Sequence, residues 1–327
     1  MTPTALELCA GAGGQALGLK RAGFTHVALV DNDEHACQTL THNFPDARVV
    51  RADIRKLRKP ERFKGIDLLA AGLPCPPFSV AGRQLGNADE RNLFPTMFDI
   101  VRATRPKAVM IETVPGLLAP KFDACRAWIC DQFDQLGYHV DMRLLDASDF
   151  GVPQRRQRVV IVALLNRHAD VFRWPKALDH SAPTVGMALQ DLMAENGWRG
   201  AAAWAKRAND VAPTIVGSTK KHGGADLGPA RSRAAWAKLS VEGKSLADAA
   251  PDKNFTGMPR LTVPMVARLQ GFPDTWQFVG KKTNAYREVG NAFPPAVAHA
   301  VASQIMKALS PGLQTRVVER VVAGRVA

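Results

Sequence analysis

Cys75 has the sequence setting of a reactive thiol rather than that of a core residue. It is flanked by Pro74, Pro76 and Pro77 and follows the apolar run Ile66–Ala71, which predicts a strand buried on both faces. Prolines fix the direction of the chain, and α/β proteins place their sites at the carboxyl ends of strands. A thiolate is a strong nucleophile, so the sequence predicts covalent chemistry at Cys75.

A carboxyl and a pair of arginines complete this candidate site. The next apolar run, Lys107–Ile111, ends in Glu112, and two adjacent strand ends would place this carboxyl near the thiol. The segment Gln154–Arg158 contains alternate arginines, and Arg156 and Arg158 project on the same side if this segment begins a strand. A solvated basic run is the alternative interpretation of these arginines.

A glycine-rich turn near the start of the chain predicts a second site, for a nucleoside. The predicted strand Ala5–Cys9 leads into Gly11–Gly14, and such a turn exposes the N–H groups of the following helix to a ligand. Asp31, at the end of the next strand, could accept hydrogen bonds from two ribose hydroxyls, and Asp53 could bind an adenine amino group. The glycines depart from the GxGxxG pattern, which favours a nucleoside cofactor without a pyrophosphate, although such turns also occur without ligands.

The elements that would position these residues alternate between strand and helix patterns. This alternation predicts a doubly wound α/β sheet covered by helices. The predicted strands are Ala5–Cys9, Val27–Val30, Val49-Val50, Ile66–Ala71, Lys107–Ile111, Tyr138–Leu144 and Arg158–Leu164, and the predicted helices are Gln15–Ala22, Glu34–Asn43, Leu93–Thr104, Val263–Leu269 and Pro295–Leu309.

The character of the chain changes near residue 173. From Trp174 to about Pro259 it is rich in glycine, proline, alanine and basic residues, with weak periodicity, and regularity returns at Val263–Leu269. Trp198, Trp204 and Trp236 lie in this stretch and indicate a smaller, irregular domain built for contact, not a linker. We therefore expect one domain from residues 1–172 plus 285–327 and a second from residues 173–284, with a terminal helix in the valine-containing tail.

The charge of the chain predicts a polyanionic partner, although a basic soluble enzyme is the alternative. The net charge is +13, and residues 199–238 hold eight lysines and arginines against two acids. No apolar run reaches the roughly 20 residues of a membrane helix, and we expect a cytoplasmic monomer. The five cysteines and eight histidines show no CxxC or HxxxH spacing, so we expect neither a disulfide framework nor a metal site.

These motifs, in their order along the chain, resemble those of the DNA cytosine-5 methyltransferases of bacterial restriction–modification systems. The resemblance covers nearly the whole chain outside the variable middle. The matching segments are Glu7–Gly14, Asp31, Asp53-Ile54, Pro74–Ser79, Glu112–Val114, Gln154–Arg158, Arg260–Thr262, Leu269–Pro273 and Gly290–Pro295.

The resemblance implies the S-adenosylmethionine-dependent methyltransferase version of the doubly wound fold, with a smaller target-recognition domain. It implies S-adenosyl-L-methionine as the cofactor, S-adenosyl-L-homocysteine as its product and double-stranded DNA as the partner. Asp31 would bind the ribose hydroxyls and Asp53 the adenine. The residues expected at the cofactor are Leu8, Cys9, Ala10, Gly11, Gly13, Gly14, Asp31, Asn32, Asp53, Ile54, Pro74, Leu93, Asn291 and Ala292.

The implied catalytic residues are Cys75, Glu112, Arg156 and Arg158. The target cytosine leaves the helix stack, and the thiolate of Cys75 adds to its C6 carbon, which makes C5 reactive toward a methyl group. Glu112 would bind N3 of the base and Arg158 its O2 oxygen. The segment from Val80 to Asn92 is predicted to be a lid over the flipped base.

The residues expected to contact DNA are spread over the lid and the middle region. In the family, a threonine followed by an aliphatic residue anchors the backbone near the target base, and Thr214 is placed there. Arginines either read guanine or touch only phosphates, and the sequence leaves both open. The expected DNA contacts are Ser79, Arg83, Gln84, Thr214, Lys220, Lys221, Arg231 and Arg233.

Two positions depart from the family pattern. Cys9 stands where an aromatic residue is usual, so one face of the adenine lacks its stacking partner, whereas Ile54 could still cover the other face. Thr113 stands where asparagine is usual, and we expect it to change the support of the catalytic loop without abolishing activity.

Three rival functions fit the sequence less well. Pro76–Phe78 echoes the motif of adenine-N6 and cytosine-N4 methyltransferases, but Cys75 stands where those enzymes need a polar partner for the amine. Transfer-RNA methyltransferases of the same family carry recognition-region tyrosines, whereas the two tyrosines here are Tyr138 and Tyr286. A non-catalytic DNA-binding regulator would most simply have lost Cys75 or Glu112, and both are present.

Overall fold

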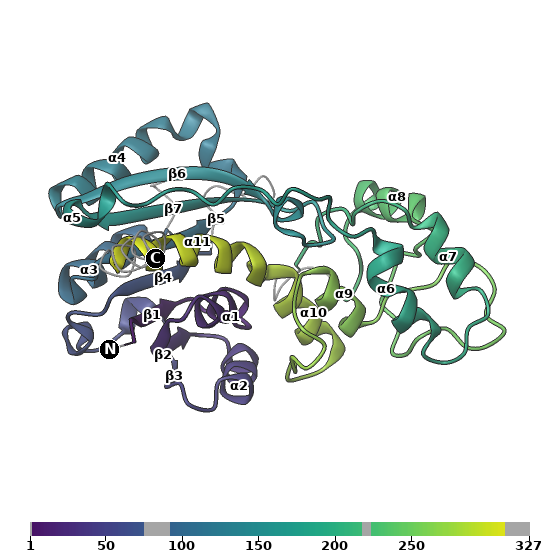
Figure 1. Cartoon of the computed structure of the whole chain (residues 1–327). Helices are drawn as coiled ribbons and strands as arrows, with labels where there is room; N and C mark the ends of the chain where they lie inside the picture. Colours follow the sequence, from purple (N-terminus) through teal and green to yellow (C-terminus); the bar gives the residue numbers. More distant parts are fainter. Residues whose placement is uncertain (1, 75–91, 218–223, 311–327) are drawn as a thin grey trace, which may run out of the picture.

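The computed structural model of the chain describes residues 2–74, 92–217 and 224–310 (Figure 1). Its strands are β1 Thr4–Leu8, β2 Thr25–Asp31, β3 Val49–Arg51, β4 Leu68–Gly72, β5 Ala108–Thr113, β6 Tyr138–Asp146 and β7 Gln157–Leu165. Its α-helices are α1 Gly14–Arg21, α2 Glu34–Asn43, α3 Phe94–Thr104, α4 Asp123–Gln135, α5 Asn166–Ala169, α6 Val185–Ala194, α7 Ala201–Arg207, α8 Ala230–Lys238, α9 Val263–Leu269, α10 Lys282–Asn291 and α11 Pro295–Leu309.

The strands form one seven-stranded sheet in the order β3-β2-β1-β4-β5-β7-β6. The strands from β3 to β5 pair in parallel, and β7 pairs antiparallel with both β5 and β6. The chain turns from one half of the sheet to the other between β1 and β4, which is where ligands bind in open α/β sheets. The predicted doubly wound fold is confirmed, with an antiparallel pair added at one edge.

Alternate residues of the central strands pack against two different helical layers. Leu6 and Leu8 of β1 lie in one apolar core with residues of α3 and α4, whereas Ala5 lies in another with residues of α1 and α11. An added Cβ on Gly18 would lie 2.4 Å from the Cβ of Ala298, so α1 and α11 approach closely because this position is glycine. The C-terminal helix thus packs directly against the first helix of the chain.

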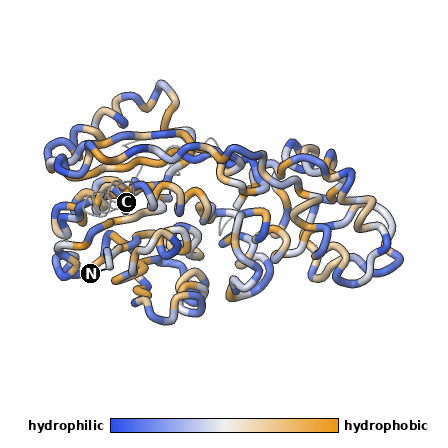
Figure 2. Tube along the Cα trace, viewed as in Figure 1, coloured by the Kyte–Doolittle hydropathy of each residue, from blue (hydrophilic) through white to orange (hydrophobic). Residues whose placement is uncertain are grey.

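The region 173–284 forms the helical lobe beside the sheet in Figure 1. Trp204 and Trp236 are fully buried and Trp198 is 6% exposed, so these rings form the core of the lobe. Figure 2 shows hydrophobic segments inside both parts of the molecule and hydrophilic segments at their outer turns.

Several helices were not predicted. The buried side of α4 is a narrow stripe of Cys125, Ile129 and Phe133, which gives a weak periodic signal between polar residues. The helices α6, α7, α8 and α10 are short and were missed for a similar reason, so the middle region is less irregular than the sequence indicates.

Candidate active site

Neighbouring strand ends bring the carboxyl of Glu112 to the segment that leads to Cys75. Gly72 of β4 pairs in register with Glu112 of β5, as the sequence predicted for adjacent strand tips. An added Cβ on Gly72 would lie 3.2 Å from the carbonyl oxygen of Cys9 and 3.9 Å from Oε2 of Glu112. The chain then passes through Leu73 and Pro74 to Cys75, which lies outside the described residues.

An ion pair orients Glu112. Nε of Arg158, on β7, lies 2.7 Å from Oε1 of Glu112, and the two side chains are 16% and 11% exposed. Because β7 runs antiparallel beside β5, the side chains come from paired strands and have a fixed relative position. Oε2 remains on the side of Gly72. The arrangement presents a carboxyl and a guanidinium side by side where β5 ends and β7 begins. Such a pair could bind a ring nitrogen and a carbonyl oxygen of a nucleobase.

Arg156 is held differently from Arg158. It is 1% exposed and donates hydrogen bonds from Nη1 to the carbonyl oxygen of Ile215 (2.8 Å) and from Nη2 to that of Gly290 (2.9 Å). The strand β7 begins at Gln157, so Arg156 precedes it and the alternation expected for the two arginines does not apply. Burial lowers the pKa of Arg156. Arg156 thus ties the middle region to the end of α10 and does not line the cavity described below.

Backbone groups hold the carboxylate of Asp31 at the glycine turn. The N–H of Gly11 donates to Oδ2 and the N–H of Asp33 to Oδ1, both at 2.8 Å. Burial raises the pKa of this carboxyl above its usual range. Gly11 and Gly13 have φ angles of 53° and 85°, which glycine adopts without strain. The turn therefore aims a fixed carboxylate at the position where the sequence predicts a ribose.

The loop between α10 and α11 lies directly on this turn. An added Cβ on Gly14 would lie 2.3 Å from the carbonyl oxygen of Phe293, so only glycine permits the approach. Asn291 is the last residue of α10 and Ala292 begins the loop, and the resemblance to the family places both in the cofactor pocket. Two segments far apart in the sequence thus form one wall.

A cavity of about 200 Å³ connects the glycine turn with Glu112. Seven of the predicted cofactor residues line it, namely Cys9, Ala10, Gly11, Gly14, Asp31, Asn291 and Ala292. The seven others do not, namely Leu8, Gly13, Asn32, Asp53, Ile54, Pro74 and Leu93. Ala12, within the predicted Gly11–Gly14 turn, also lines it, and the lining residues that were not predicted are Gln15, Asp33, Ala36, Gly72, Arg287, Glu288 and Phe293. Arg287 and Glu288 lie two to three residues before the Gly290–Pro295 motif, and that proximity is the one signal that could have identified them.

Asp53 is already bound by a neighbouring arginine. Nη2 of Arg55 lies 2.6 Å from Oδ2 and Nε lies 3.0 Å from Oδ1, and these bonds hold the pKa of Asp53 below its usual range. An adenine amino group would have to share or displace the Arg55 side chain. Ile54, beside it, is buried in the core under the sheet.

The departures from the family pattern lie close to the site. Cys9 has a φ angle of 53°, a strained value for a residue with a Cβ, and lies on the cavity wall. Thr113 is 1% exposed and ends β5, next to Glu112.

The segment that carries Thr214 is fixed by side chains from the motif around Arg156. Oε1 of Gln154 accepts a hydrogen bond from the N–H of Ile215 at 2.9 Å, and the hydroxyl of Tyr286 donates to the carbonyl oxygen of Val216 at 3.1 Å. The hydroxyl of Thr214 donates to the carbonyl oxygen of Arg155 at 2.7 Å. This segment is thus held against the end of α10, beside the cavity.

The remaining predicted DNA contacts divide into two groups. Arg231 and Arg233 lie on α8, where Arg231 is exposed and Arg233 donates to the carbonyl oxygen of Gly228 at 2.9 Å. Ser79, Arg83, Gln84, Lys220 and Lys221 lie outside the described residues. Within residues 2–74, 92–217 and 224–310, no helix could span a membrane and no group of three or more His, Cys, Asp or Glu side chains could hold a metal ion.

Known proteins match the chain over nearly its whole length. Residues 4–307 match the family described as C-5 cytosine-specific DNA methylase. The type II methyltransferase M.NgoMIV of Neisseria gonorrhoeae is 52% identical over 94% of this chain and 98% of its own length. M.NaeI of Lentzea aerocolonigenes, also named a type II methyltransferase, is 50% identical over 93% of this chain and 75% of its own length. The crystal structure of a protein assigned as a DNA modification methyltransferase of an E. coli prophage has the same fold, with a TM-score of 0.66 and 22% identity over 94% of this chain and 100% of that one.

Proposed function

Because the chain belongs to the C-5 cytosine-specific DNA methylase family, we propose that its cavity binds the cofactor at Asp31 and the target cytosine at Glu112. The protein is a DNA (cytosine-5) methyltransferase that uses S-adenosylmethionine as its methyl donor. The observation that carries the proposal is one cavity with Asp31 and Glu112 on its walls.

The residues of the cavity fit this cofactor. The Asp31 carboxylate is held by two backbone N–H groups and suits two ribose hydroxyls, and the glycine turn leaves room for a ligand at the backbone. Gln15 and Glu288, both buried, line the cavity and carry side-chain polar atoms without a hydrogen-bond partner. Such atoms are costly to bury, so they favour a polar ligand in the cavity.

The chemistry at the base follows from three side chains. The thiolate of Cys75 forms a bond to C6 of the flipped cytosine, and the electron pair of the C5–C6 double bond becomes available at C5. Glu112 takes up a proton when the base binds and donates it to N3, while Arg158 binds O2 and donates a hydrogen bond to the other oxygen of the Glu112 carboxyl. S-adenosylmethionine, when bound, supplies the electrophilic methyl group. Loss of the C5 proton to water then returns electrons to the ring and expels the Cys75 thiolate.

The second region would read the DNA. Residues 199–238 are strongly basic, which suits phosphate contacts on a duplex, and Thr214 is presented by a backbone that several side chains hold. We therefore propose double-stranded DNA as the substrate, residues 1–172 plus 285–327 as the catalytic domain and residues 173–284 as the target-recognition domain and hinge.

The likeness to type II methyltransferases supports a place in a bacterial restriction–modification system. In such a system the enzyme would act as a cytoplasmic monomer on chromosomal DNA. Its role would be to mark one short motif.

Expression in a host without cytosine methylation tests this function. We expect 5-methylcytosine at one motif, read by bisulfite sequencing, and none from a Glu112→Gln variant expressed at the same level. Methylation on adenine N6 or cytosine N4, or confined to transfer RNA, would contradict the proposal.

A further inference from the structure

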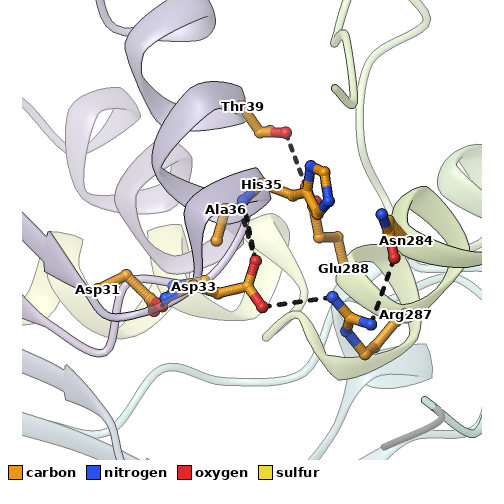
Figure 3. A network of polar contacts seen from close by, with 9 residues as sticks. Asp31, Asp33, His35, Ala36, Thr39, Asn284, Arg287 and Glu288 are labelled. Atoms are coloured by element: carbon orange, nitrogen blue, oxygen red, sulfur yellow. Dashed lines mark hydrogen bonds and ion pairs between the residues drawn. The ribbon is translucent and has the colours of Figure 1, made fainter. Parts of the chain in front are cut away.

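Glu288 is a buried carboxyl on the cavity wall that the mechanism above leaves unused. It lies on α10, is 7% exposed and precedes Asn291 by one turn of the helix. Figure 3 shows it facing α2, close to Thr39, His35 and the turn that carries Asp31. Its position places a second carboxyl beside the one that the sequence assigned to the ribose.

Hydrogen bonding fixes which oxygen of Glu288 is available. The hydroxyl of Thr39 accepts a hydrogen bond from the N–H of Val279 at 2.9 Å and donates its one hydrogen to Oε2 of Glu288 at 2.7 Å. Oε2 is therefore an acceptor, and any proton on the carboxyl must be on Oε1. Oε1 is buried and has no hydrogen-bond partner in the structure. Burying such an atom is unfavourable, so it marks a place for a ligand group.

The charged groups around Glu288 do not neutralise it. Arg287, its neighbour on α10, directs Nη2 toward Oδ2 of Asp33 at 3.3 Å. Burial raises the pKa of Glu288 to about 7, and the nearby negative charges of Asp33 and Asp31 add to the rise while Arg287 opposes it. His35 of α2 also lies beside the carboxyl in Figure 3.

We infer that Glu288 is a cofactor-binding residue whose ionised Oε1 accepts a hydrogen bond from a hydroxyl or ammonium group of S-adenosylmethionine, so that binding releases a proton. The inference rests on the proposed binding of this cofactor in the cavity. A donor on Oε1 satisfies the one unpartnered oxygen of the carboxyl. The positive charge of the cofactor also favours the ionised form among neighbouring carboxylates.

The direction of the pH effect follows from the ionised form being the binding form. Below pH 7 the free protein carries a proton on Glu288, and this proton must leave before the cofactor binds. If binding returns the pKa of Glu288 to its ordinary range, affinity rises about tenfold from pH 6 to pH 8, and about half a proton is released per cofactor at pH 7.

Calorimetric titration of the full-length protein with S-adenosylmethionine tests the inference. Titrations at pH 6, 7 and 8, each in two buffers of different ionisation enthalpy, give the Kd and the number of protons released. A Glu288→Gln variant keeps an acceptor for Thr39 but cannot ionise, and thermal unfolding without cofactor reports whether it folds. We expect its Kd to exceed that of the unchanged protein at both pH values, and the ratio of the two Kd values to be about tenfold larger at pH 8 than at pH 6.

Three further variants separate Glu288 from its surroundings. A Thr39→Val variant loses the donor to Oε2, so we expect the pH midpoint of affinity to move upward. His35→Asn and the exposed-site control Glu61→Gln should leave the pH dependence unchanged. Because the cofactor's own ammonium titrates equally with every variant, the ratio of variant to unchanged Kd isolates Glu288.

Equal Kd ratios for Glu288→Gln at pH 6 and pH 8 would overturn the inference, as would loss of the pH dependence in His35→Asn. Failure of the unchanged protein to bind S-adenosylmethionine at any pH would instead contradict the proposed function of the cavity. The two failures are therefore distinguishable.

Discussion

The strand ends of β5 and β7 and the helical lobe hold their polar side chains by different means. At these strand ends, Glu112 and Arg158 come from paired strands, and strand register fixes their ion pair. In the lobe, the segment at Ile215 has no strand ladder of its own and is held by the side chains of Gln154 and Arg156. The strand ends therefore tolerate a change in one chemical group without losing their geometry. The segment at Ile215 has a single backbone bridge, between Gln154 and Ala212, and otherwise depends on individual side chains for its geometry.

The first test of this contrast is a Glu112→Gln substitution, for which we expect the largest effect on rate. The amide keeps the shape of the side chain but cannot protonate and donate as the acid does, so kcat should fall about 10²–10⁴-fold. The free energy of unfolding should change little, because register holds the strand. Single-turnover methylation assays and chemical unfolding measure the two quantities. A large loss of stability with little loss of rate would show that Glu112 has a structural role and not a catalytic one.

Arg156→Met tests the lobe, where we expect the substitution to lower stability more than chemical rate. The substitution leaves the buried carbonyl oxygens of Ile215 and Gly290 without donors, and we expect unfolding to become easier by about 2–4 kcal/mol. DNA affinity should fall with it, because the recognition segment loses its tie. The matched control is Arg155→Met, which removes an exposed pair with Asp210 and should cost about 1 kcal/mol or less. Equal stability losses for the two variants would contradict the stabilising role of the hydrogen bonds from Arg156 to Ile215 and Gly290.

Neutralising Lys220 and Lys221 tests the charge of the lobe and should have the smallest effect. If both lysines neutralise phosphates, DNA binding weakens on every sequence, and the slope of log K against log salt flattens by about 0.9 for each phosphate that is no longer neutralised. Binding titrations at several salt concentrations measure the slope. Neutralising Lys59 and Lys64, in the basic stretch before β4, serves as the control. A flattened slope in the control alone would place the DNA at the basic stretch before β4 instead.

Much of the fold and one half of the site could be predicted from the sequence. The strand carrying Glu112 is a continuous apolar run, and the order of such runs predicts which strand ends meet. The pairing of Arg158 with Glu112 requires knowing that β7 inserts antiparallel beside β5, which no local pattern indicates.

The rest depends on contacts between distant segments. Thr39 and Glu288 are 249 residues apart, so neither residue alone indicates a polar site. Arg156 precedes β7 by one residue, and that small shift separates it from the alternation that the sequence suggests. Trp204 and Trp236 are buried in an apolar core that gathers residues from segments far apart in the sequence, such as Leu269, and the weak local periodicity of this region does not indicate that packing.

The proposed mechanism depends most on Cys75, whose thiolate is proposed to bond covalently to the target cytosine. A duplex that carries 5-fluorocytosine at the target should trap the protein covalently in the presence of S-adenosylmethionine, because fluorine at C5 cannot leave as a proton does. We expect a denaturation-resistant complex with the unchanged protein and none with Cys75→Ser, while Cys130→Ser should trap normally. A complex that survives Cys75→Ser and depends on another cysteine would contradict the account.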